Sequence, residues 1–372
     1  MTFAVICGGG TGGHVQPAIA LAEALVDHGH DRASVHFVGG RRGMEKTLVP
    51  AAGFSITTLP GRGIERRLTA RNLRSAAEIA SSVVRATVLF KQMKPSVAVS
   101  MGGYAGFPGA MAALISKVPL VVVTLDAVPG AANRLVAGRA AANAVAYPGT
   151  LLPRSSVTGP PVRSSVLAVD RGPQGRAEAR RRLGLPESGP VLLATGGSLG
   201  ARSVNAAAVG LAASWRDREG VTIYHVAGER NLESVKELAR SVGAGYGALD
   251  YKLVGFEKDM PLLLAACDLA LSRAGASMLA ELTVVGVPSV LVPLPGAPSD
   301  HQSKNAAAMA AAGAAVVIAD ADCTASRLES VLDRLLGDDD RLESMSLAAR
   351  SLGKRDAAAD VAAIVERVAK PR

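Results

Sequence analysis

Short apolar runs alternate with alanine-rich stretches of helical periodicity along the whole chain. Several of these runs, such as Leu120-Val121-Val122-Val123, are apolar at every position, as is typical of strands buried on both faces of a parallel sheet. The alternation predicts parallel sheets connected by crossover helices. Strands are expected near residues 2–7, 34–38, 55–59, 96–100, 120–124, 143–146, 191–195, 222–226, 251–254, 269–272, 289–292 and 315–318.

The strand pattern and the helix pattern are both interrupted near the middle of the chain, around residues 158–162, where Gly159, Pro160 and Pro161 follow one another. A length of 372 residues is also about twice the commonest domain size. We therefore predict two doubly wound, Rossmann-like α/β domains, residues 1–160 and 161–372. The pattern over 356–369 predicts a final helix and leaves open whether it packs back on the first domain.

Glycine-rich loops follow three of the predicted strands, at residues 8–13, 101–106 and 196–200. Glycine lets the backbone approach a ligand closely, and the free N–H groups at a helix N-terminus favour an anion. The first loop also matches the dinucleotide fingerprint Gly-x-Gly-x-x-Gly. The next strand ends in Arg41-Arg42 without the carboxylate that NAD needs, so an NADP-binding alternative stays open.

The charge balance adds to the case for an anionic ligand. The chain has 41 Lys and Arg against 32 Asp and Glu, a net charge of +9 at pH 7. With one Trp, five Tyr and six Phe it lacks the aromatic side chains on which readers of single-stranded nucleic acid stack bases. We expect a phosphate-bearing small molecule or a lipid surface as partner, and no nucleic acid.

The cysteines and apolar stretches indicate a cytoplasmic protein. Cys7, Cys267 and Cys323 are odd in number and lack CxxC spacing, so we expect buried, reduced thiols and neither disulfides nor zinc. No signal-peptide pattern precedes the first strand. The best apolar stretch, 111–124, is broken by Lys117 and Pro119 and is too short to span a bilayer.

The first loop continues into a histidine and a proline, as Gly8-Gly9-Gly10-Thr11-Gly12-Gly13-His14-Val15-Gln16-Pro17, and this string resembles glycosyltransferase family 28. The resemblance runs nearly the whole length of the chain. Its other motifs are Pro60-Gly61-Arg62-Gly63, Met101-Gly102-Gly103-Tyr104, Ala127-Val128-Pro129-Gly130, Ala132-Asn133-Arg134, Gly159-Pro160-Pro161-Val162-Arg163, Gly196-Gly197-Ser198, Gly255-Phe256, Ser272-Arg273-Ala274-Gly275-Ala276 with Glu281, and Asp300-His301-Gln302.

The resemblance implies the GT-B architecture, in which two domains face each other across a cleft. It implies an inverting, metal-independent transfer of N-acetylglucosamine (GlcNAc) from UDP-GlcNAc to the C4 hydroxyl of N-acetylmuramic acid (MurNAc). That acceptor is undecaprenyl-diphosphate-MurNAc-pentapeptide, at the cytoplasmic side of the cell membrane in peptidoglycan synthesis. No cofactor and no metal are expected, and the N-terminal domain would bind the acceptor and the membrane.

The resemblance also assigns site residues, carried over position by position. Arg163 and Ser198 would meet the diphosphate, Glu281 the ribose, and Gln302 the GlcNAc. Glu257 corresponds to a place where the family's backbone meets the uracil. The other expected donor contacts are Thr11, Gly12, Gly13, Asp126, Ala276, Ser277, Met278, Leu279 and Ala280, and the expected acceptor or diphosphate loop is Gly102, Gly103 and Tyr104.

His14, at the start of a helix, is the expected catalytic residue. It would accept the proton of the acceptor's C4 hydroxyl or orient that hydroxyl, and the alternative is a histidine that only caps the helix or fills space. His28, His30, His36 and His225 are interpreted as structural. The role of His301 stays open.

One segment departs from the family. Where family members typically read His-Glu-Gln-Asn, this chain reads Val123-Thr124-Leu125-Asp126. An aspartate at 126 accepts a hydrogen bond from a sugar hydroxyl but cannot donate one as an amide does. Two alternatives therefore stay open: a related transferase acting on another lipid or a secondary metabolite, and a non-catalytic nucleotide-sugar or NADP-binding module.

Two acidic strings offer a metal-binding alternative, at 320–322 and 338–340, where each reads Asp-x-Asp. Metal-dependent transferases place such carboxylates on the diphosphate. Both strings lie where a helix or turn is expected to begin, so we interpret them as helix caps.

A cluster of arginines lies between residues 62 and 74, interleaved with apolar residues and followed by an apolar-rich helix at 79–90. This pattern predicts a patch that binds an anionic membrane surface, with a solvated helix face as the alternative. The residues of the predicted patch are Arg66, Arg67, Arg71 and Arg74.

Overall fold

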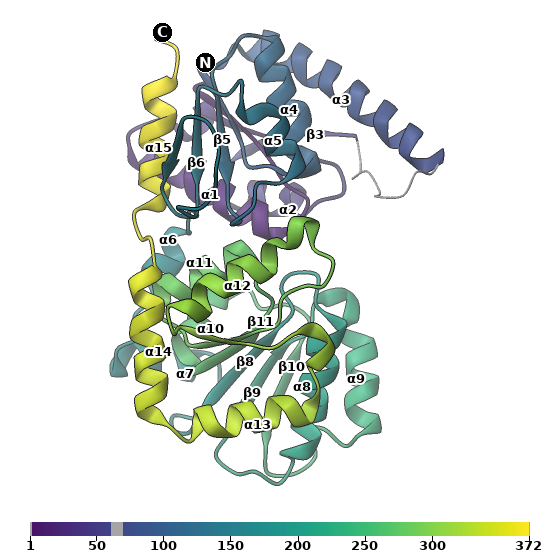
Figure 1. The fold of residues 1–372 in the computed structure, drawn as a ribbon, viewed down its shortest axis with the longest axis vertical. Helices are drawn as coiled ribbons and strands as arrows, with labels where there is room; N and C mark the ends of the chain where they lie inside the picture. Colours follow the sequence, from purple (N-terminus) through teal and green to yellow (C-terminus); the bar gives the residue numbers. More distant parts are fainter. Residues whose placement is uncertain (1, 61–69, 372) are drawn as a thin grey trace. The chain divides into compact units, whose positions relative to one another are not determined.

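The computed structural model describes residues 2–60 and 70–371, without the side chains of 70–74. The chain divides into two compact α/β units (Figure 1). Unit 1 comprises Met1–Ser164 and Lys354–Arg372, and unit 2 comprises Ser165–Gly353. A short helix, α6 (Ser164–Leu167), lies at the point where the chain passes from one unit to the other.

Unit 1 contains a seven-stranded sheet in which every described pairing is parallel. The strand order is β3-β2-β1-β4-β5-β6-β7. The strands are β1 (Ala4–Cys7), β2 (Val35–Gly40), β3 (Ser55–Leu59), β4 (Val97–Ser100), β5 (Leu120–Thr124), β6 (Ala142–Val145) and β7 (Ser155–Val157). Strands β1, β4 and β5 are buried at every position because helices cover both faces of a parallel sheet.

The helices of unit 1 supply the apolar side chains that cover this sheet. Phe90 of the long helix α3 packs in one core cluster with Val5, Cys7 and Ala98 of the central strands. The described helices are α1 (Gly12–Asp27), η1 (Arg32–Ser34), α2 (Glu45–Ala51), α3 (Ala70–Met93), α4 (Gly103–Ile115), α5 (Ala131–Ala137) and α15 (Ala357–Val368).

Unit 2 repeats the same plan with a six-stranded parallel sheet of order β10-β9-β8-β11-β12-β13. Its strands are β8 (Val191–Thr195), β9 (Thr222–Val226), β10 (Asp250–Val254), β11 (Leu269–Ser272), β12 (Ser289–Leu291) and β13 (Ala315–Val317). Its helices are α7 (Pro173–Arg182), α8 (Arg202–Ser214), η2 (Glu229–Asn231), α9 (Leu232–Ser241), α10 (Met260–Ala266), α11 (Ala276–Val285), η3 (Pro298–Asp300), α12 (His301–Ala311), η4 (Asp320–Asp322), α13 (Ala325–Leu336) and α14 (Asp339–Leu352).

The predicted strands are all present, and one strand was missed. Strand β7 has only three residues, Ser155, Ser156 and Val157, all of them exposed at the edge of the sheet. A short exposed edge strand has no buried face, so it produces no apolar pattern in the sequence.

The strand order fixes where each unit can bind a ligand. In both sheets the order reverses beside the first strand, between β1 and β4 in unit 1 and between β8 and β11 in unit 2. Ligands of open α/β sheets bind at the carboxyl ends of the strands at such a switch point. All three glycine loops of the sequence follow one of these four strands.

The last helix of the chain, α15, belongs to unit 1, where it lies against α1 and the strands β4 to β6 (Figure 1). Two histidines at the end of α1 hold it. His28 Nδ1 lies 3.2 Å and His30 Nε2 3.0 Å from the carboxylate of Glu366. The interpretation of these two histidines as structural is confirmed by these contacts.

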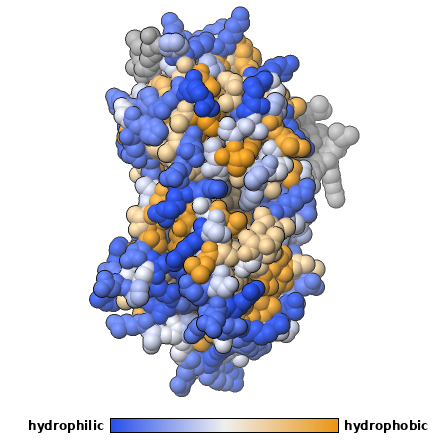
Figure 2. All heavy atoms as spheres, turned by 60° about the vertical axis from the view of Figure 1, so that its left-hand side comes forward, coloured by the Kyte–Doolittle hydropathy of each residue, from blue (hydrophilic) through white to orange (hydrophobic). Residues whose placement is uncertain are grey.

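All three thiols are buried and free, as predicted. Burial raises the pKa of Cys7 to about 12 and that of Cys267 to about 11, so both stay protonated and unreactive. Within the described residues, no helix is long and apolar enough to cross a membrane. On the face drawn in Figure 2, hydrophobic residues are interspersed with hydrophilic ones.

Candidate active site

The first glycine loop connects β1 to α1 at the switch point of unit 1. Gly9 and Gly10 have φ angles of +147° and +99°, which L side chains rarely adopt. Helix α1 then begins at Gly12, with Thr11 as an N-cap whose side chain makes no capping bond. The first N–H groups of α1 are therefore available to an anion, which the positive end of the helix dipole favours.

His14 lies between this loop and the one that follows β4. It is the third residue of α1. A Cβ built on Gly103, the first residue of α4, would lie 3.8 Å from His14 Nε2. The structure thus brings together His14, the predicted catalytic residue, with Gly12 and Gly13, predicted as donor contacts, and with the predicted acceptor or diphosphate loop of Gly102 and Gly103. The roles of these residues stay predictions.

A buried asparagine supports the second loop from behind. The Nδ2 of Asn133 donates to the carbonyl of Val123 and to Thr124 Oγ1, both at 3.0 Å. A Cβ on Gly102, whose φ is +82°, would lie 3.1 Å from the same amide. Asn133 was part of a sequence motif but had no predicted role, and the structure shows that it joins α5 to the end of β5 beneath the loop.

Sequence reasoning missed Glu45, the first residue of α2. Its side chain is only 1% exposed. Its carboxylate accepts the N–H of Gly10 at 2.8 Å and that of Gly40 at 2.7 Å. From sequence alone, a glutamate at the beginning of a helix is expected to be exposed to solvent. The only signal available was the cluster of Gly39, Gly40 and Gly43 just before it.

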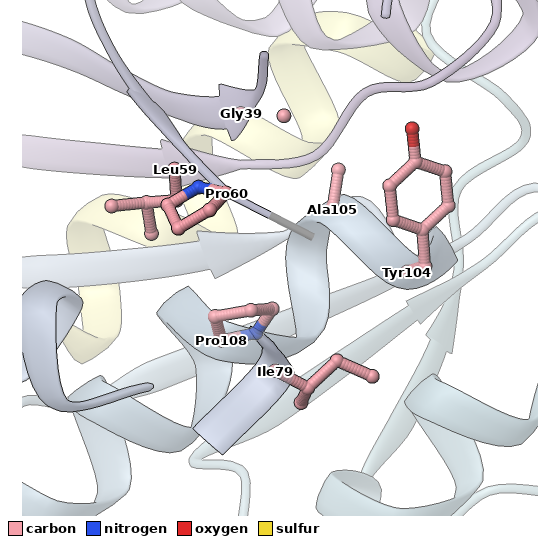
Figure 3. A pocket seen from close by; sticks show the side chains of 8 residues that line it. Gly39, Leu59, Pro60, Ile79, Tyr104, Ala105 and Pro108 are labelled. Carbon is pink, nitrogen blue, oxygen red and sulfur yellow. The ribbon is translucent and has the colours of Figure 1, made fainter. Parts of the chain in front are cut away.

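Tyr104 lies close to two of the same glycines, Gly10 and Gly40, and lines a small pocket (Figure 3). Figure 3 shows Tyr104, Ala105 and Pro108 on α4, with Ile79 of α3 facing them. Burial, together with the negative charge of Glu45, raises the pKa of Tyr104. Its hydroxyl therefore stays protonated at neutral pH and can donate a hydrogen bond.

Asp126 follows β5 and is half-buried. Burial raises the pKa of Tyr147, and the negative charge of Asp126 raises it further, so the two groups are near each other. Arg163, also partly buried, belongs to unit 1 and not to the domain that begins at residue 161 in the prediction. Donor contacts by these two residues stay predictions.

In unit 2 the glycine loop after β8 carries Ser198, which is half-exposed. Gly200, with a φ of +70°, packs so tightly that a Cβ there would lie 2.2 Å from the Ala227 carbonyl oxygen. The side chain of Asn231 holds the loop by donating to the carbonyl of Leu199 at 2.9 Å. The loop is thus rigidly shaped, and it presents Ser198 at the switch point.

The second loop at this switch point leads into α11, where the predicted nucleotide-binding segment lies. Ser277 and Met278 are half-exposed in its first turn, whereas Leu279 and Ala280 are buried. Glu281 follows and is 6% exposed. A ligand at the start of α11 can therefore reach backbone N–H groups directly, and the roles of 276–281 stay predictions.

An arginine network braces this loop. The Arg273 guanidinium donates to the carbonyl of Val292 at 3.1 Å and to Ser203 Oγ at 3.0 Å, and it forms an ion pair with Asp320. Burial would raise the pKa of Asp320, but its hydrogen bonds from Ser203 and Arg273 lower it overall. The first acidic string thus supplies a partner for Arg273. In the second string, Asp338 caps α14 by accepting the N–H of Arg341.

The side chains of two further predicted donor residues already form hydrogen bonds within the protein. Glu257 accepts hydrogen bonds from Tyr224 and from the N–H of Asp259. Gln302 Oε1 accepts the N–H of Leu294 at 2.9 Å, so its amide NH₂ remains to donate. Gln302 follows a strained turn, in which Ser299 and Asp300 have φ angles of +55° and +52°. Such strain is common at functional sites.

The predicted membrane patch lies outside the described residues. Arg66 and Arg67 belong to the segment 61–69, and the side chains of Arg71 and Arg74, on the first turns of α3, are not described either. Further along α3, Val84 and Val88 are 64% and 50% exposed.

Comparisons with known proteins agree with this arrangement. The model of the glycosyltransferase family 28 N-terminal domain matches residues 4–145, and that of the C-terminal domain matches 191–361. A relative from Clavibacter michiganensis is 39% identical, over 98% of this chain and 96% of its own. One from Desulforudis audaxviator is 35% identical, over 98% of both chains. Both are named UDP-N-acetylglucosamine–N-acetylmuramyl-(pentapeptide) pyrophosphoryl-undecaprenol N-acetylglucosamine transferase.

Solved structures share the fold. The crystal structure of Acinetobacter baumannii MurG is 26% identical and covers 99% of this chain and all of its own, with a TM-score of 0.74. A Staphylococcus aureus MnaA structure with UDP covers 100% of this chain and 99% of its own at a TM-score of 0.69, but at 13% identity it shows the fold alone. On the family models and full-length relatives together, this chain belongs to glycosyltransferase family 28.

Proposed function

We propose that this chain transfers GlcNAc from UDP-GlcNAc to the C4 hydroxyl of MurNAc on undecaprenyl-diphosphate-MurNAc-pentapeptide, a step of peptidoglycan synthesis. The observation that carries the proposal is the match over nearly the full chain to relatives named for this transfer, at up to 39% identity. The two glycine-lined switch points agree with it, because both the donor and the acceptor carry a diphosphate.

Unit 2 supplies most of the donor contacts in this proposal, and Asp126 and Arg163 add contacts from unit 1. The UDP diphosphate lies against the loop of Ser198 and the first N–H groups of α11, and Glu281 accepts hydrogen bonds from the ribose hydroxyls. Gln302 donates its amide NH₂ to the sugar. As the glycosidic bond breaks, the departing UDP gains negative charge, which helix N-termini and Arg163 stabilise.

Unit 1 binds the acceptor, with its diphosphate at the loop of Gly102, Gly103 and Tyr104, whereas Thr11, Gly12 and Gly13 contact the sugar or diphosphate of the donor. His14 Nε2 accepts the proton of the C4 hydroxyl while that oxygen attacks C1 of GlcNAc and the bond from C1 to the UDP oxygen breaks. A single displacement of this kind inverts the configuration at C1. The charge that leaves with UDP is thus balanced by the proton held on His14.

The lipid-linked acceptor requires the protein to work at a membrane surface. We place this contact on unit 1, at Arg66, Arg67, Arg71 and Arg74, and on the cytoplasmic side. The exposed Val84 and Val88 of α3 agree with an apolar contact between this helix and a membrane.

The test is an assay of radiolabelled UDP-GlcNAc with the undecaprenyl-diphosphate-MurNAc-pentapeptide acceptor. We expect label in the lipid fraction only when the acceptor is present, and release of one UDP for each sugar transferred. Calorimetry with UDP-GlcNAc alone gives the donor affinity independently. A protein that binds UDP-GlcNAc but labels no lipid, or that converts UDP-GlcNAc without any acceptor, would contradict the proposal.

A further inference from the structure

Glu45 is a buried carboxylate that the proposed mechanism does not use. Within the described residues no arginine or lysine forms an ion pair with it, and its two oxygens accept only backbone N–H groups, from Gly10 and Gly40. Gly10 lies in the loop after β1, and Gly40 is the last residue of β2. One side chain therefore joins the carboxyl ends of two neighbouring strands. A buried charge is tolerated when it is hydrogen-bonded in this way.

Three glycines are shaped around this carboxylate. A Cβ on Gly9 would lie 2.2 Å from Glu45 Cδ, one on Gly39 2.5 Å from its Cγ, and one on Gly43 1.9 Å from its Oε2. Real Cβ atoms essentially never come closer than 3.0 Å to another heavy atom. Glycine is thus needed at these three positions for Glu45 to keep its place. The N–H groups that a ligand could reach come later in the chain, at the start of α1.

The carboxylate also determines how the loop leads into the helix. By holding the N–H of Gly10, it fixes the left-handed backbone at Gly10, directly before the N-cap Thr11. In the first turn, the N–H of His14 donates to the Thr11 carbonyl at 3.1 Å. The place of His14 therefore depends on a loop that Glu45 anchors.

Tyr104 contacts the same anchored glycines from the pocket side. A Cβ on Gly10 would lie 3.2 Å from the Tyr104 ring, and one on Gly40 3.5 Å from it. Figure 3 shows the ring standing on α4 with Gly39 nearby. Glu45 thus fixes the two glycines against which Tyr104 packs, although its own oxygens face the backbone and not the pocket.

We propose that Glu45 is a positioning residue for the acceptor half of the reaction: it holds the first glycine loop so that the start of α1, His14 and Tyr104 are preorganised for the acceptor. This inference rests on the proposed function. Glu45 does not touch the reacting atoms in this proposal, because it is only 1% exposed and its oxygens accept backbone N–H groups. Its loss lowers the rate with acceptor, whereas the donor contacts proposed in unit 2, Ser198, Glu281 and Gln302, do not depend on it.

The test compares Glu45→Gln and Glu45→Asp with the parent. A glutamine amide turns an NH₂ toward one of the two N–H donors, and an aspartate is too short to reach both, so each variant loses one bond. We expect kcat with the lipid-linked acceptor to fall by about 100-fold, as a misplacement near 1 Å produces. The Kd for UDP-GlcNAc by calorimetry should stay within about twofold, because Ser198, Glu281 and Gln302 belong to unit 2 and Glu45 to unit 1. Glu366→Gln, in the same unit but on α15, is the matched control and should keep the parent's kcat.

A second measurement does not depend on turnover. Amide hydrogen exchange should accelerate at Gly10 and Gly40 in both Glu45 variants and not in Glu366→Gln. Parent-like kcat and acceptor KM in a folded Glu45→Gln protein would overturn the inference, as would unchanged exchange at both glycines. If the parent itself fails to label the lipid acceptor, the proposed function fails, and the exchange data still decide whether Glu45 holds the loop.

Discussion

His14 and Glu281 are the proposed catalytic residue and the proposed ribose-binding residue, and the surrounding structure restricts the position of each. His14 is held in the first turn of a helix beside a second glycine loop, and Glu281 is almost fully buried on α11. Their sequence motifs placed both on helices after glycines. The structure adds that one belongs to unit 1 and the other to unit 2, so their variants are expected to separate the chemical step from donor binding.

His14→Ala should lower kcat by about 10²–10⁴-fold, the usual contribution of a positioned proton acceptor. The Kd for UDP-GlcNAc should barely change, because His14 acts on the acceptor hydroxyl and the proposed ribose and sugar contacts, Glu281 and Gln302, lie in unit 2. Steady-state kinetics with saturating donor and calorimetry measure the two quantities. His28→Ala, at the other end of α1 and in contact with Glu366, is the control. If His14→Ala keeps near-parent kcat, the base is another group, and Asp126 is the first to test.

Glu281→Ala should weaken binding of UDP-GlcNAc by about 1–3 kcal/mol, the range for hydrogen bonds to a charged acceptor. Calorimetry on the folded variant measures this directly, with circular dichroism as the check on folding because Glu281 is buried. Glu219→Ala removes an exposed carboxylate from the same unit and should bind like the parent. An unchanged Kd for Glu281→Ala would remove this residue from the donor site.

At the scale of elements, buried polar networks tie helices to strand ends. In unit 2, His225 on β9 is fully buried, with its Nδ1 2.8 Å from the Tyr251 hydroxyl and its Nε2 3.1 Å from Asn205 Oδ1. Because the amide NH₂ of Asn205 donates to the Ala227 carbonyl, its Oδ1 faces the ring as an acceptor. Nε2 therefore carries a proton, and in the neutral ring, which burial favours, Nδ1 accepts from the Tyr251 hydroxyl.

This network predicts a loss of stability in mild acid. Burial lowers the pKa of His225 to about 4, from about 6.5 in the unfolded chain. Above pH 6.5 both states are neutral. As the pH falls toward 4, only the unfolded state gains the proton, so the free energy of unfolding decreases by up to about 3 kcal/mol. Denaturant titrations between pH 7 and 4 measure the slope, which His225→Gln should flatten and His301→Gln should not. An equally steep slope in His225→Gln would contradict this prediction.

At the scale of the whole molecule, the net charge of +9 favours an anionic partner. The membrane patch is the proposed source. Replacing Arg66, Arg67, Arg71 and Arg74 with Gln should release the protein from anionic vesicles at low salt, since each such charge contributes about 1 kcal/mol near the surface. Turnover with a water-soluble acceptor should be unaffected.

The matched control removes the same number of charges from exposed sites of unit 2, at Arg182, Arg230, Arg327 and Arg341. Sedimentation with vesicles distinguishes a local patch from net charge alone. Equal release of both variants would show that net charge acts without a local patch, and no release of either would make the arginines between 62 and 74 a solvated face.

The sequence by itself determined the strands, the two-unit plan and the glycine loops, because each follows from local causes. A fully buried parallel strand needs a continuous apolar run, and a left-handed turn needs glycine. The tertiary structure decided what those loops contact. Glu45 meets Gly10 across 35 positions, Asn133 supports Gly102, and α15 returns to unit 1. Such contacts depend on strand order and on packing between distant segments, and neither of these produces a periodic pattern in the amino-acid sequence.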